Sequence, residues 1–253
     1  MTILGIIPAR YASTRFPGKP LVLIDGKTMI RRVYEQATLC SCLDRVVVAT
    51  DHEKIVRHVA SFGGNVMMTG EHHRSGTERC MEVVEKLKET GETFDYVINI
   101  QGDEPFIDPA QITQLAGCFS RPGTLLATLI RKITKPEELV SPNVVKVVTD
   151  SQGSALFFSR SVIPFTRGAE MKNWLSATSY YKHIGIYGYS APVLKTIVDL
   201  PPSPLEIAES LEQLRWLENG FKIQTQVTDY ESVAIDTPDD LLKITNSNGT
   251  FLQ

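Results

Sequence analysis

The chain has 253 residues, of which 42% are hydrophobic and 22% are charged, a composition typical of a globular protein with a sizeable core. Its formal net charge of −3 argues against a nucleic-acid-binding protein, because such proteins need an excess of cations to neutralise phosphates. No apolar run approaches the roughly 18 residues of a membrane-spanning helix, and Arg10 and Arg15 interrupt any signal-peptide core. We therefore expect one cytoplasmic domain of residues 1–253, with no membrane or nucleic-acid partner.

Short apolar segments alternate with helical patterns over about the first 123 residues. Strands are predicted at 3–7, 46–50, 65–68 and 96–101, and helices within 28–40, 55–62, 80–87 and 112–119. This alternation is typical of right-handed βαβ crossovers. It predicts an α/β fold with a mainly parallel central sheet flanked by helices.

The pattern changes after about residue 123, where strand-like segments follow one another with fewer helices. These segments are 125–130, 144–148, 155–158 and 183–189, and they are followed by a predicted helix at 205–219, strands near 223 and at 232–235, and a C-terminal helix. We interpret this part as a mixed-sheet extension over the mouth of an active site. The subregion at about 125–190 is expected to bind substrate and to form a dimer.

The loop after the first predicted strand concentrates positive charge. It contains Arg10, Arg15 and Lys19. Pro8 fixes its own backbone φ angle, whereas Gly18 can adopt φ values that other residues avoid. Three cations at the carboxyl end of a strand suit several phosphate groups better than one. The loop therefore suggests a nucleoside triphosphate as ligand.

Two aspartates follow predicted strands. Asp103 comes after Gln101-Gly102 at the end of the strand 96–101, where ligands bind in open α/β sheets, and Asp236 closes the strand 232–235. Beside a triphosphate, both suit Mg²⁺, which takes one or two carboxylates and completes its shell with phosphate and water oxygens. Each has an alternative role at a helix start, although Thr237 could cap the last helix instead of Asp236.

Several motifs together resemble the 3-deoxy-manno-octulosonate (Kdo) cytidylyltransferases, a branch of the sugar nucleotidyltransferases. They are Pro8-Ala9-Arg10, Arg15 with Pro17-Gly18-Lys19, the segment 74–79, the segment 101–105, Arg160 with Ile163-Pro164, the segment 182–187, the segment 209–215 and the segment 235–241. They occur in order along nearly the whole chain. The resemblance implies a Rossmann-like nucleotidyltransferase fold and a homodimer. It also implies an enzyme that transfers CMP from CTP to the anomeric hydroxyl of Kdo, releasing pyrophosphate, for lipopolysaccharide synthesis.

The resemblance also implies residue roles. It implies catalytic roles for Arg10, Lys19, Asp103 and Asp236, with Asp103 and Asp236 as ligands of Mg²⁺. Nucleotide contacts are expected from Pro8, Ala9, Arg10, Arg15, Lys19, Arg74, Ser75, Gly76 and Gln101. Contacts to the sugar acid are expected from Gln101, Arg160, His183, Tyr187, Glu212 and Gln213.

Some alternatives stay open at this point. His183 could be an ordinary hydrogen-bonded histidine of a strand, and Glu212 with Arg215 could form an exposed helical ion pair. His72 and His73 are interpreted as a solvated loop. The acceptor could be 8-amino-Kdo or another sugar acid such as a sialic acid, and a catalytically silent nucleotide-binding module is the rival from another class.

Overall fold

The computed structural model describes residues 1–12, 16–231 and 233–246. The chain forms two compact units, a first unit of Met1–Ile112 with Glu231–Gln253 and a second unit of Thr113–Tyr230. The prediction of one domain over residues 1–253 stays a prediction, since compact units of this kind also occur within single domains. Over the described residues, no helix is long and apolar enough to cross a membrane.

A parallel sheet forms the centre of the first unit. Its strands run in the order β6 (Tyr96–Asn99), β1 (Ile3–Ala9), β4 (Arg45–Thr50) and β5 (Val66–Met68). In β1 the apolar side chains are buried, as expected for a central strand covered on both faces. The parallel α/β arrangement predicted from the sequence is confirmed.

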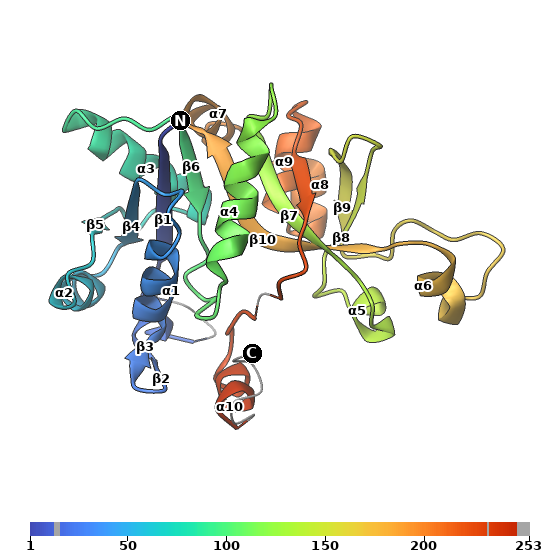
Figure 1. Cartoon of the computed structure of the whole chain (residues 1–253), viewed down its shortest axis with the longest axis horizontal. Helices are drawn as coiled ribbons and strands as arrows, with labels where there is room; N and C mark the ends of the chain where they lie inside the picture. The colour runs from blue at the N-terminus through green and yellow to red at the C-terminus, as the bar shows by residue number, and fades with distance from the viewer. Residues whose placement is uncertain (13–15, 232, 247–253) are drawn as a thin grey trace. The chain divides into compact units, whose positions relative to one another are not determined.

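Three helices connect these strands: α1 (Met29–Thr38), α2 (Glu53–Ser61) and α3 (Gly76–Glu89). Helices α1 and α3 pack against β1, and α2 packs against β4 and β5 (Figure 1). Each helix buries one apolar stripe, for example Ile55 and Val59 in α2. Because each helix follows a strand, the loops that carry function begin at the carboxyl ends of the strands.

A small hydrophobic cluster joins the two sequence segments of the first unit. The short helix η1 (Lys19–Leu21) and the hairpin β2 (Leu23–Ile24) and β3 (Lys27–Thr28) precede α1, and α10 (Pro238–Asn246) ends the described chain. Ile235 is fully buried against Ile24 and Met29. The predicted strand at 232–235 is wrong for residues 233–235, which form no strand where described, and Ser232 lies outside the described residues. One hydrogen bond, from the Ile235 amide to the Asp103 carbonyl at 2.9 Å, fixes this segment instead.

The second unit contains the predicted mixed sheet. Its strands are β7 (Leu126–Lys132), β8 (Lys146–Thr149), β9 (Ala155–Ser159), β10 (Tyr181–Ser190) and β11 (Gln224–Val227). Strand β10 pairs antiparallel with β7 and β8, β8 pairs antiparallel with β9, and only β11 runs parallel to its partner β7 (Figure 1). Helix α4 (Pro109–Gly117) and η2 (Cys118–Ser120) lead into this sheet.

Five helices cover or flank this unit: α5 (Pro136–Val140), α6 (Trp174–Ala177), α7 (Ala191–Val198), α8 (Pro204–Glu209) and α9 (Glu212–Glu218), with η3 (Met171–Asn173) before α6. The single helix predicted at 205–219 is wrong, because the chain breaks at Ser210. Ser210 adopts the left-handed conformation with φ 51° and ends α8. The break lets α9 start anew at Glu212.

Candidate active site

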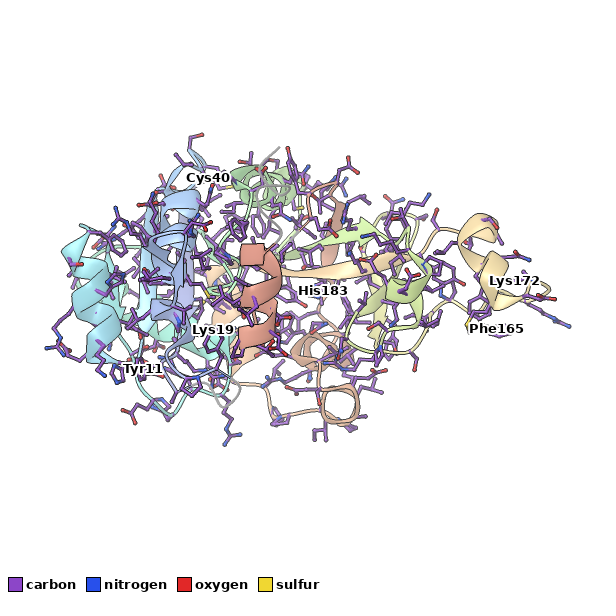
Figure 2. The ribbon with its side chains drawn as sticks, turned by 90° about the horizontal axis from the view of Figure 1, so that it is seen from below. Tyr11, Lys19, Cys40, Phe165, Lys172 and His183 are labelled. Carbon is purple, nitrogen blue, oxygen red and sulfur yellow. The ribbon has the colours of Figure 1, made fainter. Side chains whose placement is uncertain are left out.

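A cleft of about 220 Å³ opens at the carboxyl ends of β1 and β6 in the first unit. It is lined by Pro8, Ala9, Arg10, Lys19, Pro20, Ser75, Gly76, Arg79, Gln101, Gly102, Asp103 and Asp236. Figure 2 shows Tyr11 and Lys19 on this side of the unit and Cys40 on the opposite side. Nine of the sequence-predicted site residues therefore line one cleft: Pro8, Ala9, Arg10, Lys19, Ser75, Gly76, Gln101, Asp103 and Asp236.

Glycines allow the backbone segments of the cleft to approach one another. A Cβ added at Gly102 would lie 2.5 Å from the carbonyl oxygen of Pro8, a distance that no side chain tolerates. At Gly76, the first residue of α3, a Cβ would come within 3.2 Å of the Asn99 side chain. Gly102 is thus required for the close approach of the ends of β1 and β6, and Gly76 leaves room for Asn99 at the start of α3.

Lys19 lies at the centre of the charged part of the cleft. Its Nζ donates to Asp103 Oδ2 at 2.8 Å and to Asp236 Oδ1 at 3.3 Å. Gly18, at φ 71°, turns the chain into η1 so that Lys19 begins the short helix. The Lys19 side chain is only 14% exposed, which strengthens its attraction to the two carboxylates.

Neither aspartate fills the alternative role at a helix start. Thr237 Oγ1 accepts from the Asp240 amide at 3.3 Å, so Thr237 caps α10 and the Asp236 carboxylate points to Lys19. Near α4 it is Asp108 whose carboxylate accepts from the Ala110 amide, at 2.8 Å. Asp103 lies five residues earlier in the chain and bonds Lys19 instead.

The amino end of α3 also faces the cleft. Ser75 caps this helix, its Oγ accepting from the Glu78 amide at 3.2 Å, and the helix dipole at this end favours a bound anion. Arg74 is exposed and is not among the residues that line the cleft, and Arg15 lies outside the described residues.

The loop before Arg74 is only partly solvated. His72 is exposed as expected, but His73 is half-buried and hydrogen-bonded to Glu82, so the interpretation of a solvated loop is wrong for His73. Burial raises the pKa of Glu82, but hydrogen bonds from Lys86, the Gly70 amide and His73 outweigh it and lower the pKa to about 2. Glu82 is thus ionised near pH 7 and holds this loop through its hydrogen bonds to Gly70 and His73.

In the second unit, the predicted sugar-binding residues His183 and Tyr187 are neighbours on β10, with ring centroids 5.1 Å apart. Desolvation lowers the pKa of His183 to about 3, so its half-buried ring is neutral near pH 7. Burial, reinforced by Tyr189 and Glu212, raises the pKa of Tyr187. The Tyr187 hydroxyl is buried and has no hydrogen-bond partner within the described part of the chain.

The remaining sugar-site candidates lie around the break between α8 and α9. Gln213 is buried, and Glu212 accepts from the 8% exposed Arg215 at 3.2 Å, so the alternative of an exposed ion pair is wrong. Arg160 donates through Nε to the Glu209 carbonyl at 2.7 Å and through Nη1 to the Pro142 carbonyl at 3.0 Å. These bonds fix the direction of its guanidinium group.

Three residues of the cleft, Pro20, Arg79 and Gly102, have no role predicted from the sequence, and Arg79 is the charged one of the three. Arg79 is fully buried and donates to Asp51 Oδ2 at 2.8 Å and to Thr69 Oγ1. The sequence signal is an arginine one turn before Val83 on the apolar face of α3, because a cation there needs a buried partner.

Comparison with known proteins shows the family of the chain. The family described as Cytidylyltransferase matches residues 4–223. The 3-deoxy-manno-octulosonate cytidylyltransferase of Bacteroides thetaiotaomicron is 54% identical over 244 residues, covering 95% of this chain and 96% of that protein. The one of Thermodesulfovibrio yellowstonii is 49% identical, covering 95% of this chain and 96% of that protein.

Solved structures agree as well. A CMP:2-keto-3-deoxy-manno-octonic acid synthetase complexed with CTP has a TM-score of 0.89 at 41% identity, and the match covers 98% of both chains. A cytidylyltransferase of Leptospira borgpetersenii, at 15% identity and a TM-score of 0.61 over 100% of this chain and 97% of that one, shares the fold. The chain therefore belongs to the cytidylyltransferase family, among the 3-deoxy-manno-octulosonate cytidylyltransferases.

Proposed function

We propose that this chain transfers CMP from CTP to the anomeric hydroxyl of Kdo and releases pyrophosphate. The observation that carries the proposal is the ion-paired group of Lys19, Asp103 and Asp236 in a cleft at the carboxyl ends of parallel strands. The reaction needs a cation that binds the triphosphate and carboxylates that ligate the accompanying Mg²⁺. Lys19 supplies the first and the two aspartates supply the second. The product is expected to feed lipopolysaccharide synthesis in the cytoplasm, where CTP is made.

The chain's own cations assist the departure of pyrophosphate. Arg10, exposed at the cleft, and Lys19, inside it, are proposed to contact the triphosphate together with Arg15 and Arg74. Charge builds on the leaving group as the bond to the α-phosphorus breaks, and fixed cations stabilise that charge. The backbone around Pro8, together with Ala9, Ser75, Gly76 and Gln101, is proposed to hold the nucleoside.

The donor set of the cleft fits Mg²⁺. Asp103 and Asp236 each place a carboxylate oxygen within 3.3 Å of the same Lys19 nitrogen, so both can reach one cation. Mg²⁺ uses one or two protein carboxylates and takes its other oxygens from phosphates and water. When bound, it supplies charge neutralisation on the phosphates and acidifies the attacking hydroxyl. Lys19 then remains available to the phosphates as a second cation.

The hydrogen bonds around His183 show which of its ring nitrogens can accept a hydrogen bond from a sugar hydroxyl. Thr128 Oγ1 lies 2.7 Å from the Ile186 carbonyl, which can only accept, so the threonine proton goes there. Thr128 Oγ1 must then accept from His183 Nε2 at 2.9 Å, which assigns the imidazole proton to Nε2. Nδ1 is left as an acceptor. We propose that it accepts a hydroxyl of the sugar acid.

Four further side chains are proposed to complete the sugar site. The buried hydroxyl of Tyr187, which has no hydrogen-bond partner among the described residues, can bond a sugar oxygen, and Glu212 and Gln213 can bond sugar hydroxyls. Arg160 uses three of its five donors on the carbonyls of Glu209, Pro142 and Ser210. Its two other donors are proposed to bind the sugar carboxylate. Gln101 is also proposed to contact the sugar acid, as the family resemblance implies.

A homodimer through the second unit is also proposed. A groove of about 360 Å³ between α5 and α6 is lined mainly by apolar side chains, including Leu139, Val140 and Met171. Val140 is 54% exposed, and Phe165, six residues before Met171, is 75% exposed. Figure 2 shows Phe165 and Lys172 at the end of the unit away from His183. Sedimentation experiments that compare the oligomeric state of the wild type with that of Val140→Asp test the homodimer. A monomeric wild type would contradict it.

The test of the reaction is pyrophosphate release from CTP with Mg²⁺, offering Kdo, 8-amino-Kdo and a sialic acid separately. Release with Kdo that a chelator abolishes is the expected result. Release only with another sugar acid would change the identity of the acceptor but would still support transfer of CMP from CTP. CTP binding without any release contradicts the proposed function and favours a silent module.

A further inference from the structure

Arg79 is a buried cation near the start of α3 and one of the residues that line the cleft. Its guanidinium donates to Asp51 Oδ2 at 2.8 Å, and the side-chain exposures of Arg79 and Asp51 are 1% and 11%. Thr69 accepts a further hydrogen bond from Arg79. A buried ion pair of this kind gives little net stability compared with well-packed apolar side chains. What it does provide is a fixed geometry.

Asp51 also contacts the segment that follows Arg10. Its other carboxylate oxygen, Oδ1, accepts from the backbone amide of Tyr11 at 3.4 Å. The Tyr11 ring stacks on His52, with ring centroids 3.9 Å apart and planes inclined by 18°. Tyr11, one residue after Arg10, is therefore held on the segment between β4 and α2 by both its backbone and its side chain.

Tyr11 in turn holds the far end of the loop. Its carbonyl accepts from the amide of Gly18 at 2.9 Å, and a Cβ at Gly18 would lie 3.6 Å from the Tyr11 ring. Lys19 follows Gly18 directly, and Arg10 precedes Tyr11. The two cations of the described loop are thus placed by one residue, which is itself held by Asp51.

We propose that the Arg79–Asp51 pair positions Arg10 and Lys19 for the β- and γ-phosphates of the bound nucleotide. The pair acts on these two cations through the contacts of Tyr11 with Asp51 and with Gly18. The inference rests on the proposed function, because it takes a nucleoside triphosphate as the ligand. It predicts that loosening the pair weakens binding of CTP more than binding of CMP, which lacks the β- and γ-phosphates.

The test compares Asp51→Asn with the wild type. Asparagine keeps an oxygen for the Tyr11 amide but removes the charge opposite Arg79. CTP and CMP dissociation constants are measured by calorimetry well below the unfolding temperature, with kcat and KM for CTP alongside. We expect CTP affinity to fall by about tenfold and CMP affinity by less than about threefold, the scale of one lost charged hydrogen bond. Asp51→Glu, which keeps the charge, should recover part of the CTP affinity.

Asp44→Asn is the matched control. Asp44 Oδ2 accepts from the backbone amide of Ile3 at 2.7 Å, so it holds β1 at the end away from the cleft. This variant should leave the ratio of CTP to CMP affinity unchanged. If Asp51→Asn does not fold, the double variant Asp51→Leu with Arg79→Met removes both charges and leaves neither one buried alone.

An equal loss of CTP and CMP affinity, or no loss in a folded variant, overturns the inference and leaves the pair a purely structural one. Failure of the proposed function has a different signature. In that case the wild type itself releases no pyrophosphate with any sugar acid, whatever the variants do.

Discussion

Lys19 Nζ lies 2.8 Å from Asp103 Oδ2, which joins the cation of the first loop to the carboxylate at the end of β6. Asp236 Oδ1 lies 3.3 Å from the same nitrogen. One positive charge therefore faces two negative charges inside a partly buried cleft, where charges interact more strongly than in water. Two carboxylates this close together are ligands that Mg²⁺ uses, which supports the proposed magnesium site. The arrangement thus brings the proposed triphosphate cation and the proposed metal ligands together.

Asp103→Asn and Asp236→Asn should each raise the Mg²⁺ concentration needed for half-maximal turnover. Each removes one carboxylate from a set of two, so Mg²⁺ would keep one protein carboxylate and depend more on phosphate and water oxygens. Titration of pyrophosphate release with Mg²⁺ measures the shift. Asp25→Asn is the control, because Asp25 is a 72% exposed carboxylate of the β2–β3 turn. Unchanged Mg²⁺ curves for both cleft variants would contradict the metal assignment.

Lys19→Ala should lower kcat by about 10²-fold or more, the scale for removing one preorganised group that stabilises developing charge. The cleft otherwise keeps both carboxylates, now without their ion-pair partner. Steady-state kinetics at saturating CTP measure the loss. Lys27→Ala is the matched control: Lys27 is 47% exposed and pairs with Glu35 at the surface, where such pairs contribute little. Near-wild-type turnover of Lys19→Ala would rule out this role.

Gly102→Ala should reduce activity because the added methyl group would lie 2.5 Å from the Pro8 carbonyl oxygen. Relief of that clash must move the end of β1 away from the end of β6, and the cleft lies between these two ends. KM for CTP and the unfolding temperature measure the effect. Gly117→Ala is the control, since an added Cβ there meets nothing within 4 Å. A fully active Gly102→Ala enzyme would show that the close approach is unnecessary.

The sequence predicts the parallel core and most of the cleft for physical reasons. Buried strands such as β1 are continuous apolar runs, and the residues after them must lie at one edge of a parallel sheet. The association of Asp103 with Lys19 follows from that rule. Asp236 is less predictable, because residues 233–235 form no strand where described and one hydrogen bond from Ile235 places them.

Other features depend on contacts that leave no local pattern. Arg79 and Asp51 are 28 residues apart in the chain, and no spacing rule joins a helix residue to the end of a separate strand. The break at Ser210 is similar, because serine rarely adopts the left-handed conformation and a helical apolar pattern continues across it. Tertiary packing decides both features, so a single sequence could not reveal them.

His183 provides a prediction that does not depend on the substrate. Its pKa is about 3 in the folded protein, because the ring is desolvated, against 6.5 for the ordinary group. Below pH 6.5 the unfolded chain binds a proton at this residue that the folded chain does not, so the associated stability is present above pH 6.5 and is lost as the pH falls towards 3. The free energy of unfolding should fall by about 2 kcal/mol between pH 7.5 and 5 from this residue alone.

His183→Gln isolates that contribution, since all other titrating groups are common to both proteins. Glutamine can still donate to Thr128 Oγ1, which His183 Nε2 approaches to 2.9 Å in the wild type. Urea unfolding of both proteins at pH 7.5, 6 and 5 gives the difference in free energy at each pH. The stability gap between wild type and variant should shift by about 2 kcal/mol in favour of the variant as the pH falls to 5. A constant gap would mean that the imidazole ionises in the folded state, and Nδ1 could then not be a permanent acceptor for the sugar.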